Sequence, residues 1–476
     1  MKKFIAVLLS FSMLFGIAAC GGGSTNEPQT TGELQFDENG NVIFKQIDID
    51  LTTVVTGDDK SYLQQIISEF NTEYNGRINV AATYTGQETF SAGFPRQVAN
   101  NSNVPDLIMD HQKDYRYFKD SDLLQPFTPV IEQSKIDIDL EDYSAGLAQY
   151  ATLGTDEVYG IPIDVRSMCV YYNKKALAEI GKTVPSTRTE LLDVCAAAKA
   201  KGWLPVAVGT TGNFYVDYFF GTAIMQNGGS FYESDNGFKT DCYTDTENRK
   251  SYLNAINSLR EMYDKGYIVE NTASSTCLSR FLDGTALFYV DVPWNLNSVI
   301  TAYADKKDIT KDECTKDYVG GTSLAKWFGL DAASEDSNKI FGDSHFFAMC
   351  ISVSDITKKA AICEFVKWFT QTYNAGSIWA DAGHITASNV IRENPDYQAK
   401  SSVSNFLTKF FPDPKYMECP GDSPYYEQTF GGMSGFYSQL MANSKSGSKG
   451  EELLRKDEMT IKNFETSVNQ KIALVM

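Results

Sequence analysis

The sequence predicts an α/β fold of two lobes, because strand-like and helix-like segments alternate in two long series. The first series starts near residue 47 and the second near residue 168. No stretch of pure glycine and serine separates them, which favours lobes joined by crossing strands over separate domains on a linker. A chain of 476 residues is long enough to bury a core in each lobe.

The first series alternates strand, helix, strand, helix and strand. Its first strand is the β-branched run IDIDLTTVV, and the helix after it has apolar residues on one face. In a parallel sheet, ligands bind at the carboxyl ends of the strands, which here carry TGDDK, TGQE and DHQ. The expected strands are 47–55, 77–84 and 104–110, and the expected helices are 61–74 and 90–101.

The second series begins with a strand near Met168 and continues with a helix in the segment VPSTRTELLDVCAAAKAKG. Thr187 and Glu190 have the spacing of a capping box at the start of this helix, and Gly202 stands where a glycine ends a helix. The remaining expected elements are a strand at 204–209, a helix at 249–266 and a strand at 284–293.

The amino terminus has the pattern of an export signal. A short basic head precedes an apolar run that is too short for a membrane span. The run ends on IAAC, which resembles a bacterial lipobox and implies cleavage before Cys20 and a diacylglyceryl group on its sulfur. The alternative is an ordinary signal peptide with a chance cysteine. Residues 1–19 are expected to be a signal peptide, with Cys20 as the lipid anchor at the extracytoplasmic face of the cell membrane.

Residues 20–44 are expected to hold the lipidated cysteine and a flexible tether. The segment GGGSTNEPQTTGE is rich in glycine and polar residues and has no apolar periodicity. The folded body would then begin at residue 45.

The composition narrows the class of partner. A formal charge of −19 at pH 7 argues against binding nucleic acid, and an acidic, aromatic-rich body suits a neutral or polar small ligand. The eight cysteines after Cys20 form no C-x-x-C pair, so zinc-ribbon and thioredoxin interpretations lack support. Their even number permits disulfides in an exported protein, but we expect mostly free, buried thiols because Cys195 and Cys350 lie in apolar patterns.

Four stretches resemble the extracellular solute-binding proteins of ABC importers, family 1, the maltose-binding-protein-like group whose best-known members bind maltose and other sugars. The most specific is YGIPIDVRSMCVYYNKKALAEIGKTVPSTRTELL, with a Y-G-I-P strand, a Y-N-K turn and a helix near E-L. The sequence departs from the family pattern in three places. Arg188 stands where the family usually has Trp, GHIT (residues 383–386) stands where it usually has G-Y-I-P or similar, and the residues after about 395 match no family pattern. The other stretches are INVAATYTGQETF with NNSNVPDLIMD, FLDGTALFYVDVPWNLNSV, and AICEFVKWFTQTYNAGSIWADAGHITAS.

The resemblance implies a hinge-closing, periplasmic-binding-protein-like (type II) fold, in which each lobe is a mainly parallel sheet flanked by helices. Crossing strands are expected near 164–166 and near 318–323. The implied partners are a sugar and the permease subunits of the importer, with the receptor a monomer and no metal or cofactor required. The expected lobes are 45–165 with 324–382, and 166–323 with 383–476.

The candidate ligand-binding residues lie at strand ends and at the expected crossing. Trp294 follows a strand and suits the C–H face of a sugar, and the family places a ligand-stacking aromatic there; the alternative is a core tryptophan. Asp58 or Asp59 would accept hydrogen bonds from hydroxyls, or else cap a helix. Arg166 would bind ligand or pin the closed lobes. The other candidates are Asp110, His111, Tyr215, Tyr218, Asn295 and His384.

The expected function is capture of a carbohydrate, with an oligosaccharide preferred, between two lobes that close over it. A non-sugar polar solute remains an alternative, and so does a lipid-anchored carbohydrate-active enzyme. The sequence has no G-x-S-x-G, H-E-x-x-H, Walker A or Rossmann motif, so no catalytic residue is expected. A structural adhesin is disfavoured because it would show repeats.

Overall fold

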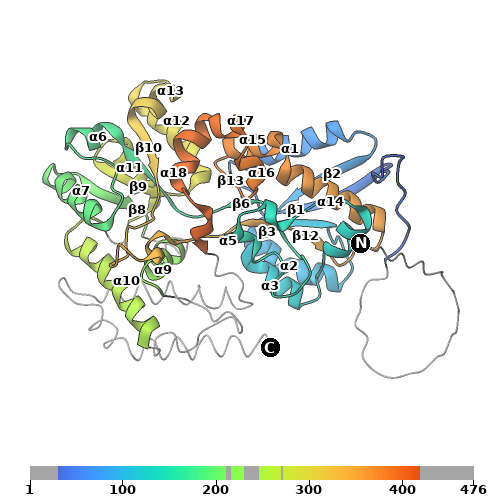
Figure 1. The fold of residues 1–476 in the computed structure, drawn as a ribbon. Coiled ribbons are helices and arrows are strands. Elements are labelled where there is room, and N and C mark those ends of the chain that lie inside the picture. Colours follow the sequence, from blue (N-terminus) through green and yellow to red (C-terminus); the bar gives the residue numbers. More distant parts are fainter. Residues whose placement is uncertain (1–29, 211–215, 230–245, 270–271, 419–476) are drawn as a thin grey trace, which may run out of the picture.

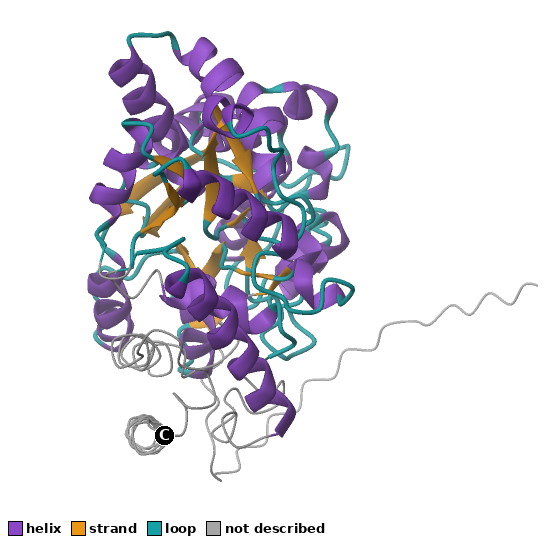
Figure 2. Ribbon diagram, turned by 90° about the vertical axis from the view of Figure 1, so that its left-hand side faces the viewer, coloured by secondary structure: helices purple, strands orange, loops and turns teal. Residues whose placement is uncertain are grey.

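The computed structural model describes residues 30–210, 216–229, 246–269 and 272–418. Two α/β lobes lie side by side, each with a central sheet and covering helices (Figure 1). Viewed at right angles, the strands occupy the interior and the helices the outside (Figure 2). The α/β fold is therefore confirmed. No helix in these ranges is long and apolar enough to cross a membrane, and the expected signal peptide and Cys20 lie outside them.

The first lobe is built on a six-stranded sheet. Its strands are β1 (Ile47–Thr53), β2 (Ile78–Tyr84), β3 (Leu107–His111), β4 (Leu124–Gln125), β5 (Ile161–Pro162) and β12 (His345–Cys350). The order is β2-β1-β3-β12-β4, with β5 also paired to β12. β1 runs parallel to β2 and β3, whereas β12 is antiparallel to its three neighbours.

Helices cover both faces of this sheet. They are α1 (Lys60–Glu73), α2 (Gln87–Ala99), α3 (Gln112–Asp120), α4 (Thr128–Ser134), α5 (Ala145–Ala148), α14 (Ile356–Gln371), α15 (Tyr373–Asp381), α16 (Asn389–Arg392) and α17 (Pro395–Ala399). Apolar side chains of α1, α14 and α15 pack against one face, and those of α2 and α3 pack against the other. The loops at the carboxyl ends of β1 and β3 are left at one edge.

The second lobe has a four-stranded sheet in the order β10-β7-β9-β8. β8 and β9 are parallel, but β7 is antiparallel to both β9 and β10, so the expectation of a mainly parallel sheet is wrong here. β7 brings the chain into the lobe, and β10 runs back alongside it in the opposite direction. The bounds are β7 (Cys169–Asn173), β8 (Leu204–Val208), β9 (Ala286–Asp291) and β10 (Val319–Thr322).

The helices of the second lobe surround this sheet. Those before β10 are α6 (Lys174–Glu179), α7 (Arg188–Ala200), α9 (Gly221–Met225), α10 (Thr246–Asp264), α11 (Ser274–Leu282), α12 (Leu296–Lys307) and α13 (Lys311–Glu313), and α18 (Thr408–Phe410) follows later. The Thr187 side chain caps α7 by accepting the backbone N–H of Glu190 at 3.2 Å. Gly202 has φ +82°, a left-handed conformation that suits a glycine just after a helix.

Arg188 departs from the family pattern and lies inside the second lobe. Its guanidinium donates to the backbone carbonyls of Ser258 and Trp327, each at 2.9 Å, and to Glu261 at 2.7 Å. It therefore joins α7 to α10 and to the segment that contains Trp327.

Two crossing segments run side by side between the lobes. Arg166 and Asp343 exchange both backbone hydrogen bonds at 2.7 Å. Two-residue pairs flank this point: β6 (Asp164–Val165) with β13 (Ile385–Thr386), and β11 (Ile340–Phe341) with β14 (Met417–Glu418).

The second crossing lies later in the chain than the expected range 318–323. Leu324, Trp327 and Phe341 pack in the hydrophobic core of the second lobe, and the Trp327 ring lies 5.6 Å from that of Phe288 in β9. Burial of these apolar side chains keeps residues 324–341 with the second lobe instead of the first.

The segment after residue 382 also differs from the expected division. α16 and α17 pack on α14 and α15 of the first lobe, whereas the Phe410 ring of α18 lies 5.1 Å from that of Tyr171 in β7. The carboxyl-terminal segment therefore packs on both lobes.

Residues 30–44 belong to the folded body, which corrects the expectation of a tether up to residue 44. Thr31 forms a bridge with Asp355, and Phe36 forms one with Val42. Phe44 is buried in the first-lobe core. Apolar residues in this short segment are sufficient to dock it despite its polar composition.

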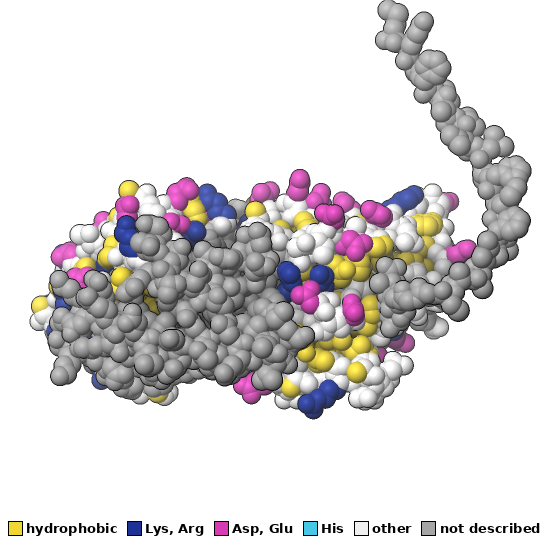
Figure 3. Space-filling view, turned by 90° about the horizontal axis from the view of Figure 1, so that it is seen from below, with side chains coloured by type: hydrophobic (Ala, Val, Ile, Leu, Met, Phe, Trp, Pro, Cys, Tyr) yellow, Lys and Arg dark blue, Asp and Glu magenta, His cyan; other side chains and the backbone are white. Residues whose placement is uncertain are grey.

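The six cysteines in the described ranges are free and buried. The surface is mixed, with acidic and basic side chains interspersed on the described part of the face in Figure 3.

Candidate functional site

All three histidines of the chain gather at the boundary between the lobes, beside the crossing segments. They come from the end of β3 (His111), the start of β12 (His345) and the loop between α15 and β13 (His384). Carboxylates and one guanidinium pair with them. The other charged members of this group are Asp59, Asp164, Arg166 and Asp343.

Asp164 lies at the centre of the group and is fully buried. One carboxylate oxygen accepts the backbone N–H of His345 at 2.9 Å, and the other accepts His345 Nδ1–H at 2.7 Å and Trp379 Nε1–H at 3.0 Å. Burial opposes its charge, but His345 and His384 outweigh burial and hold the pKa of Asp164 well below its usual range. Asp164 is therefore ionised at neutral pH.

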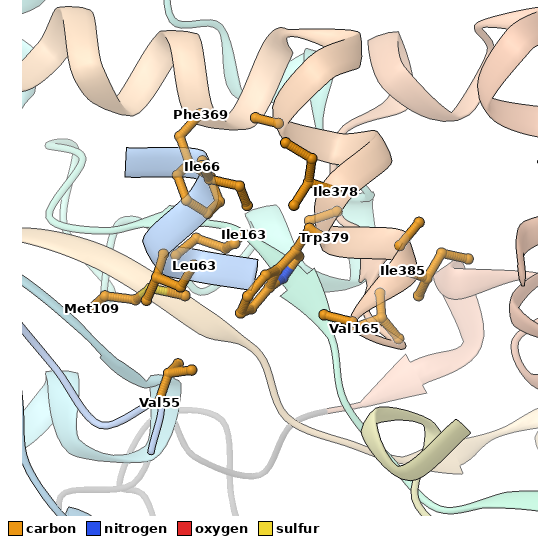
Figure 4. Close-up of a cluster of buried hydrophobic side chains, with 14 of the residues drawn as sticks. Val55, Leu63, Ile66, Met109, Ile163, Val165, Phe369, Ile378, Trp379 and Ile385 are labelled. Carbon is orange, nitrogen blue, oxygen red and sulfur yellow. The ribbon is translucent and has the colours of Figure 1, made fainter. Parts of the chain in front are cut away.

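His384 is enclosed by the first lobe. Its ring lies parallel to Trp379, with 4.2 Å between centroids. Trp379 in turn is set in an apolar wall formed by α1, α15 and the crossing strand, including Leu63, Ile163 and Val165 (Figure 4). The nitrogens of His384 face Asp59 (Nε2–Oδ2, 3.1 Å) and Asp164 (Nδ1–Oδ2, 3.0 Å).

Asp59 has a role other than helix capping. It precedes α1, but its side chain makes no capping hydrogen bond and binds His384 instead. Burial opposes its charge, while His384 lowers the pKa of Asp59.

Arg166, His111 and Asp343 form a second polar set on the crossing. Arg166 Nη1 lies 3.3 Å from Asp343 Oδ2 and 3.2 Å from His111 Nε2, and His111 Nδ1 lies 3.1 Å from the same Asp343 oxygen. Burial and the charge of Arg166 lower the pKa of His111 to about 3, so His111 is neutral. The Nε–H of Arg166 is buried with no hydrogen-bond partner in the described residues.

Asp110 points away from the histidines, into a separate polar group with Gln87 and Asp114 at the ends of α2 and α3. Gln87 and Ser91 donate to Asp114. Burial and the charge of Asp114 raise the pKa of Asp110 well above its usual range. Burial thus favours the protonated form of this carboxyl, and Asp110, one of the candidate ligand-binding residues, is not part of the group around the histidines.

Trp294 is the main contribution of the second lobe to this boundary. It follows β9 in a short helical turn, and its ring is half-buried. The Arg166 guanidinium lies over this ring, 4.5 Å from the centroid. The ring is also parallel to that of His384, with 6.0 Å between centroids. Of the sequence candidates, the structure brings together Asp59, His111, Arg166, Trp294 and His384.

The remaining candidates lie apart from this group. Asn295 donates to Asp291 at 3.1 Å, and exposed Asp58 accepts from Ser298 across the two lobes at 2.6 Å. Tyr218 is buried in the second-lobe core against Phe341. Tyr215 lies outside the described residues.

Sequence reasoning missed Asp164, Asp343, His345 and Trp379. Asp164 and Asp343 sit where the chain crosses between the lobes, and His345 starts the strand after the second crossing. For His345, one available signal was that the chain has only three histidines, two of which were already candidates.

The group Asp164, His345 and His384 contains the donor types of a divalent metal site, with ligand atoms within 4.8 Å of one another. Its oxygen–nitrogen separations of 2.7 and 3.0 Å are those of hydrogen-bonded and ion-paired side chains. Trp379 also donates to the same Asp164 oxygen. We therefore interpret the group as a proton-bearing network.

Comparisons with known proteins agree with this architecture. Solved structures with the same fold include a cyclic α-maltosyl-1,6-maltose binding protein from Arthrobacter globiformis (14% identity, 89% of this chain and 98% of that one, TM-score 0.65). They also include the maltose-maltodextrin binding protein of Alicyclobacillus acidocaldarius (17%, 89% and 100%, TM-score 0.62) and an ABC substrate-binding protein from Listeria monocytogenes in complex with cycloalternan (15%, 90% and 100%, TM-score 0.63).

No curated protein matches the chain. The family model described as bacterial extracellular solute-binding protein matches residues 55–372, which is more than half of the sequence. The chain therefore belongs to the family of bacterial extracellular solute-binding proteins.

Proposed function

We propose that the protein is the lipid-anchored receptor of an ABC importer and captures a carbohydrate, preferably an oligosaccharide, between its lobes for delivery to the permease. Membership of the solute-binding family supports the transport role, and the sugar ligands named for structures of the same fold support the ligand class. The receptor acts by binding and release without chemical change to the ligand.

The observation that carries the sugar assignment is the pairing of Trp294 with Arg166 at the boundary between the lobes. An indole ring packs well against the C–H face of a pyranose. Arg166 Nε–H lacks a protein partner in the described residues, so a ligand hydroxyl that enters when the lobes separate can accept it. Trp294 and Arg166 would thus contact the ligand directly.

The charge of the group favours a neutral ligand over an anion. Asp59, Asp164 and Asp343 have lowered pKa values and are ionised, whereas their positive partners are the Arg166 guanidinium and His384, whose pKa is raised by Asp164 and Asp59 against burial. An added phosphate or carboxylate would meet a net negative environment. Among non-sugar polar solutes, this argument disfavours an anion such as a phosphodiester.

Thermal unfolding of the chain from Gly21 onward, against a panel of mono- and oligosaccharides, tests the proposal. A ligand at 100 times its Kd adds about 2.7 kcal/mol of stability, so the midpoint should rise with the cognate sugar. Trp294→Ala should abolish that rise, and Leu330→Ala, at an exposed second-lobe position, should keep it. Glycan cleavage in the same wells would contradict the receptor proposal in favour of an enzyme. If no sugar raised the midpoint and none were cleaved, the ligand would be sought among other solutes.

We also propose that Cys20 carries the anchor, because the sequence before it resembles a lipobox. The full chain should then sediment with membranes and incorporate labelled palmitate. Cys20→Ala should lose the label; retention of the label by this variant would contradict the anchor at Cys20.

A further inference from the structure

His384 is enclosed too completely to act as the ligand contact that the sequence suggested. Its side chain has 0% exposure, and its neighbours come from four places in the fold. Asp59 precedes α1, Asp164 lies on β6, His345 begins β12 and Trp379 belongs to α15. A solute between the lobes would meet Trp294 and Arg166 before it could meet this ring.

Both ring nitrogens of His384 face a carboxylate. Nε2 lies 3.1 Å from Asp59 and Nδ1 lies 3.0 Å from Asp164. A neutral imidazole has one N–H and one lone pair, so it would turn a lone pair toward one of these oxygens. The Nε2–Asp59 contact is a hydrogen bond, whereas Nδ1 lies close to Asp164 without hydrogen-bond geometry in the described residues. An imidazolium replaces the repulsion between a ring lone pair and the Asp164 carboxylate with attraction, and it also strengthens the parallel stack on Trp379.

The loop that holds His384 touches the backbone before Trp294. Gly383 has φ +91°, and a Cβ at this position would lie 2.1 Å from the carbonyl oxygen of Pro293. The Trp294 ring is also parallel to that of His384. A change in the position of His384 is therefore transmitted to Trp294 by direct contact.

We propose that His384 is a positively charged positioning residue, whose ion pairs with Asp59 and Asp164 hold Trp294 in place for ligand binding. The proposal rests on Trp294 being the sugar platform, and it adds a proton as a requirement for that site. Loss of the proton would leave two carboxylates facing a neutral ring and would loosen the loop at 383–386.

The surrounding charges determine the direction of the pH dependence. Burial works against charge on His384, but Asp164 and Asp59 outweigh it and raise the pKa of His384 above 6.5. His345, with 5.7 Å between ring centroids, has a lowered pKa and stays neutral, and Arg166 is turned toward Trp294 and Asp343. The stabilisation is fully present below the unfolded pKa near 6.5 and is lost as pH rises through the folded value.

Imidazole NMR of the chain from Gly21 onward, which contains every described residue, tests the charge without any ligand. With three histidines, each signal can be assigned by one His→Gln variant. We expect His384 to be doubly protonated at pH 7 and to titrate above the usual value. Asp59→Asn should lower that midpoint, and the matched Asp58→Asn should leave it unchanged, because Asp58 binds Ser298 instead.

The link to binding is tested with the sugar identified in the thermal panel. Affinity should fall about tenfold as pH rises through the His384 midpoint, since a desolvated cation–aromatic contact and an ion pair are lost together. His384→Gln should bind weakly with a flat pH profile. If that variant does not fold, Asp59→Asn should still move the pH profile to lower values.

Each outcome separates this inference from the proposed function. A sugar that binds with equal affinity across the titration overturns the role of His384 and leaves the receptor intact. A neutral His384 at pH 7, or a His384 signal that shifts on adding zinc and not with Asp59→Asn, also overturns it. If no sugar binds at all, the NMR titration and the pH dependence of the thermal midpoint still decide whether His384 is charged.

Discussion

The two lobes use buried charge in different places. In the first lobe and the crossing, buried charges such as Asp164 and His384 lie at the boundary where the candidate site is. In the second lobe, Arg188 is buried among backbone carbonyls of its own core, and the lobe presents an aromatic ring, Trp294, to the boundary. In the first lobe, the buried charges that contribute to stability therefore also belong to the candidate site. In the second lobe, the buried charge lies away from the site.

This difference has a physical basis. Burying a charge is itself costly, and removing one partner from a buried network is strongly destabilising because it leaves the remaining groups uncompensated. At the boundary such a network fixes geometry for a ligand. Inside the second lobe, the same type of group only joins helices. The comparison predicts that a substitution in the boundary network will lower both the free energy of unfolding and the ligand affinity. A substitution of similar severity inside the second lobe will lower the free energy of unfolding alone.

The largest expected effect is that of Asp164→Asn. The substitution places an amide among the His345 and Trp379 donors and removes a charge opposite His384. We expect a loss of about 3–5 kcal/mol in the free energy of unfolding, measured by urea titration, together with weaker sugar binding.

The control for Asp164→Asn is Asp193→Asn. Asp193 also forms an ion pair, with Lys182, but its side chain is 63% exposed. Solvent screens such a pair, so the loss should be about 0–1 kcal/mol. Equal losses for the two variants would show that the buried network has no special weight.

A smaller effect is expected for Arg188→Met. The change removes the donor for the Ser258 and Trp327 carbonyls, but Glu261 is partly exposed and can turn to water. We expect a loss of about 2–4 kcal/mol in stability with ligand affinity unchanged at a temperature where the variant is folded. If Arg188→Met lowered the ligand affinity more than Asp164→Asn does, the comparison between the lobes would be reversed.

Local patterns were sufficient to predict most elements and to name some members of the candidate site. Alternating strands and helices placed β1, β2, β3 and β9 correctly, and the Thr187 cap and Gly202 turn were visible in the sequence. Because ligand sites gather at strand ends, Asp59, His111 and Trp294 could be named in advance. Asp110 was also named, but alternation along β3 turns its side chain to the opposite face from His111.

The centre of the site was out of reach of such reasoning. Asp164 binds His345, 181 residues away, and Trp379, 215 residues away. No local period relates these positions, and a buried aspartate in a two-residue strand has no distinctive pattern. The second crossing was misplaced for the same reason, since nothing local indicates that Trp327 packs against β9 or that Phe341 packs against Tyr218.

The sequence by itself determined the class of fold, the order of its elements and the kind of residue at each strand end, because period and capping are properties of neighbouring residues. Only the tertiary structure decided which of those residues meet, where the chain crosses between the lobes and that His384 faces two carboxylates. Those outcomes depend on burial and on contacts between segments hundreds of residues apart, where the electrostatic environment of a side chain is set by its neighbours in space.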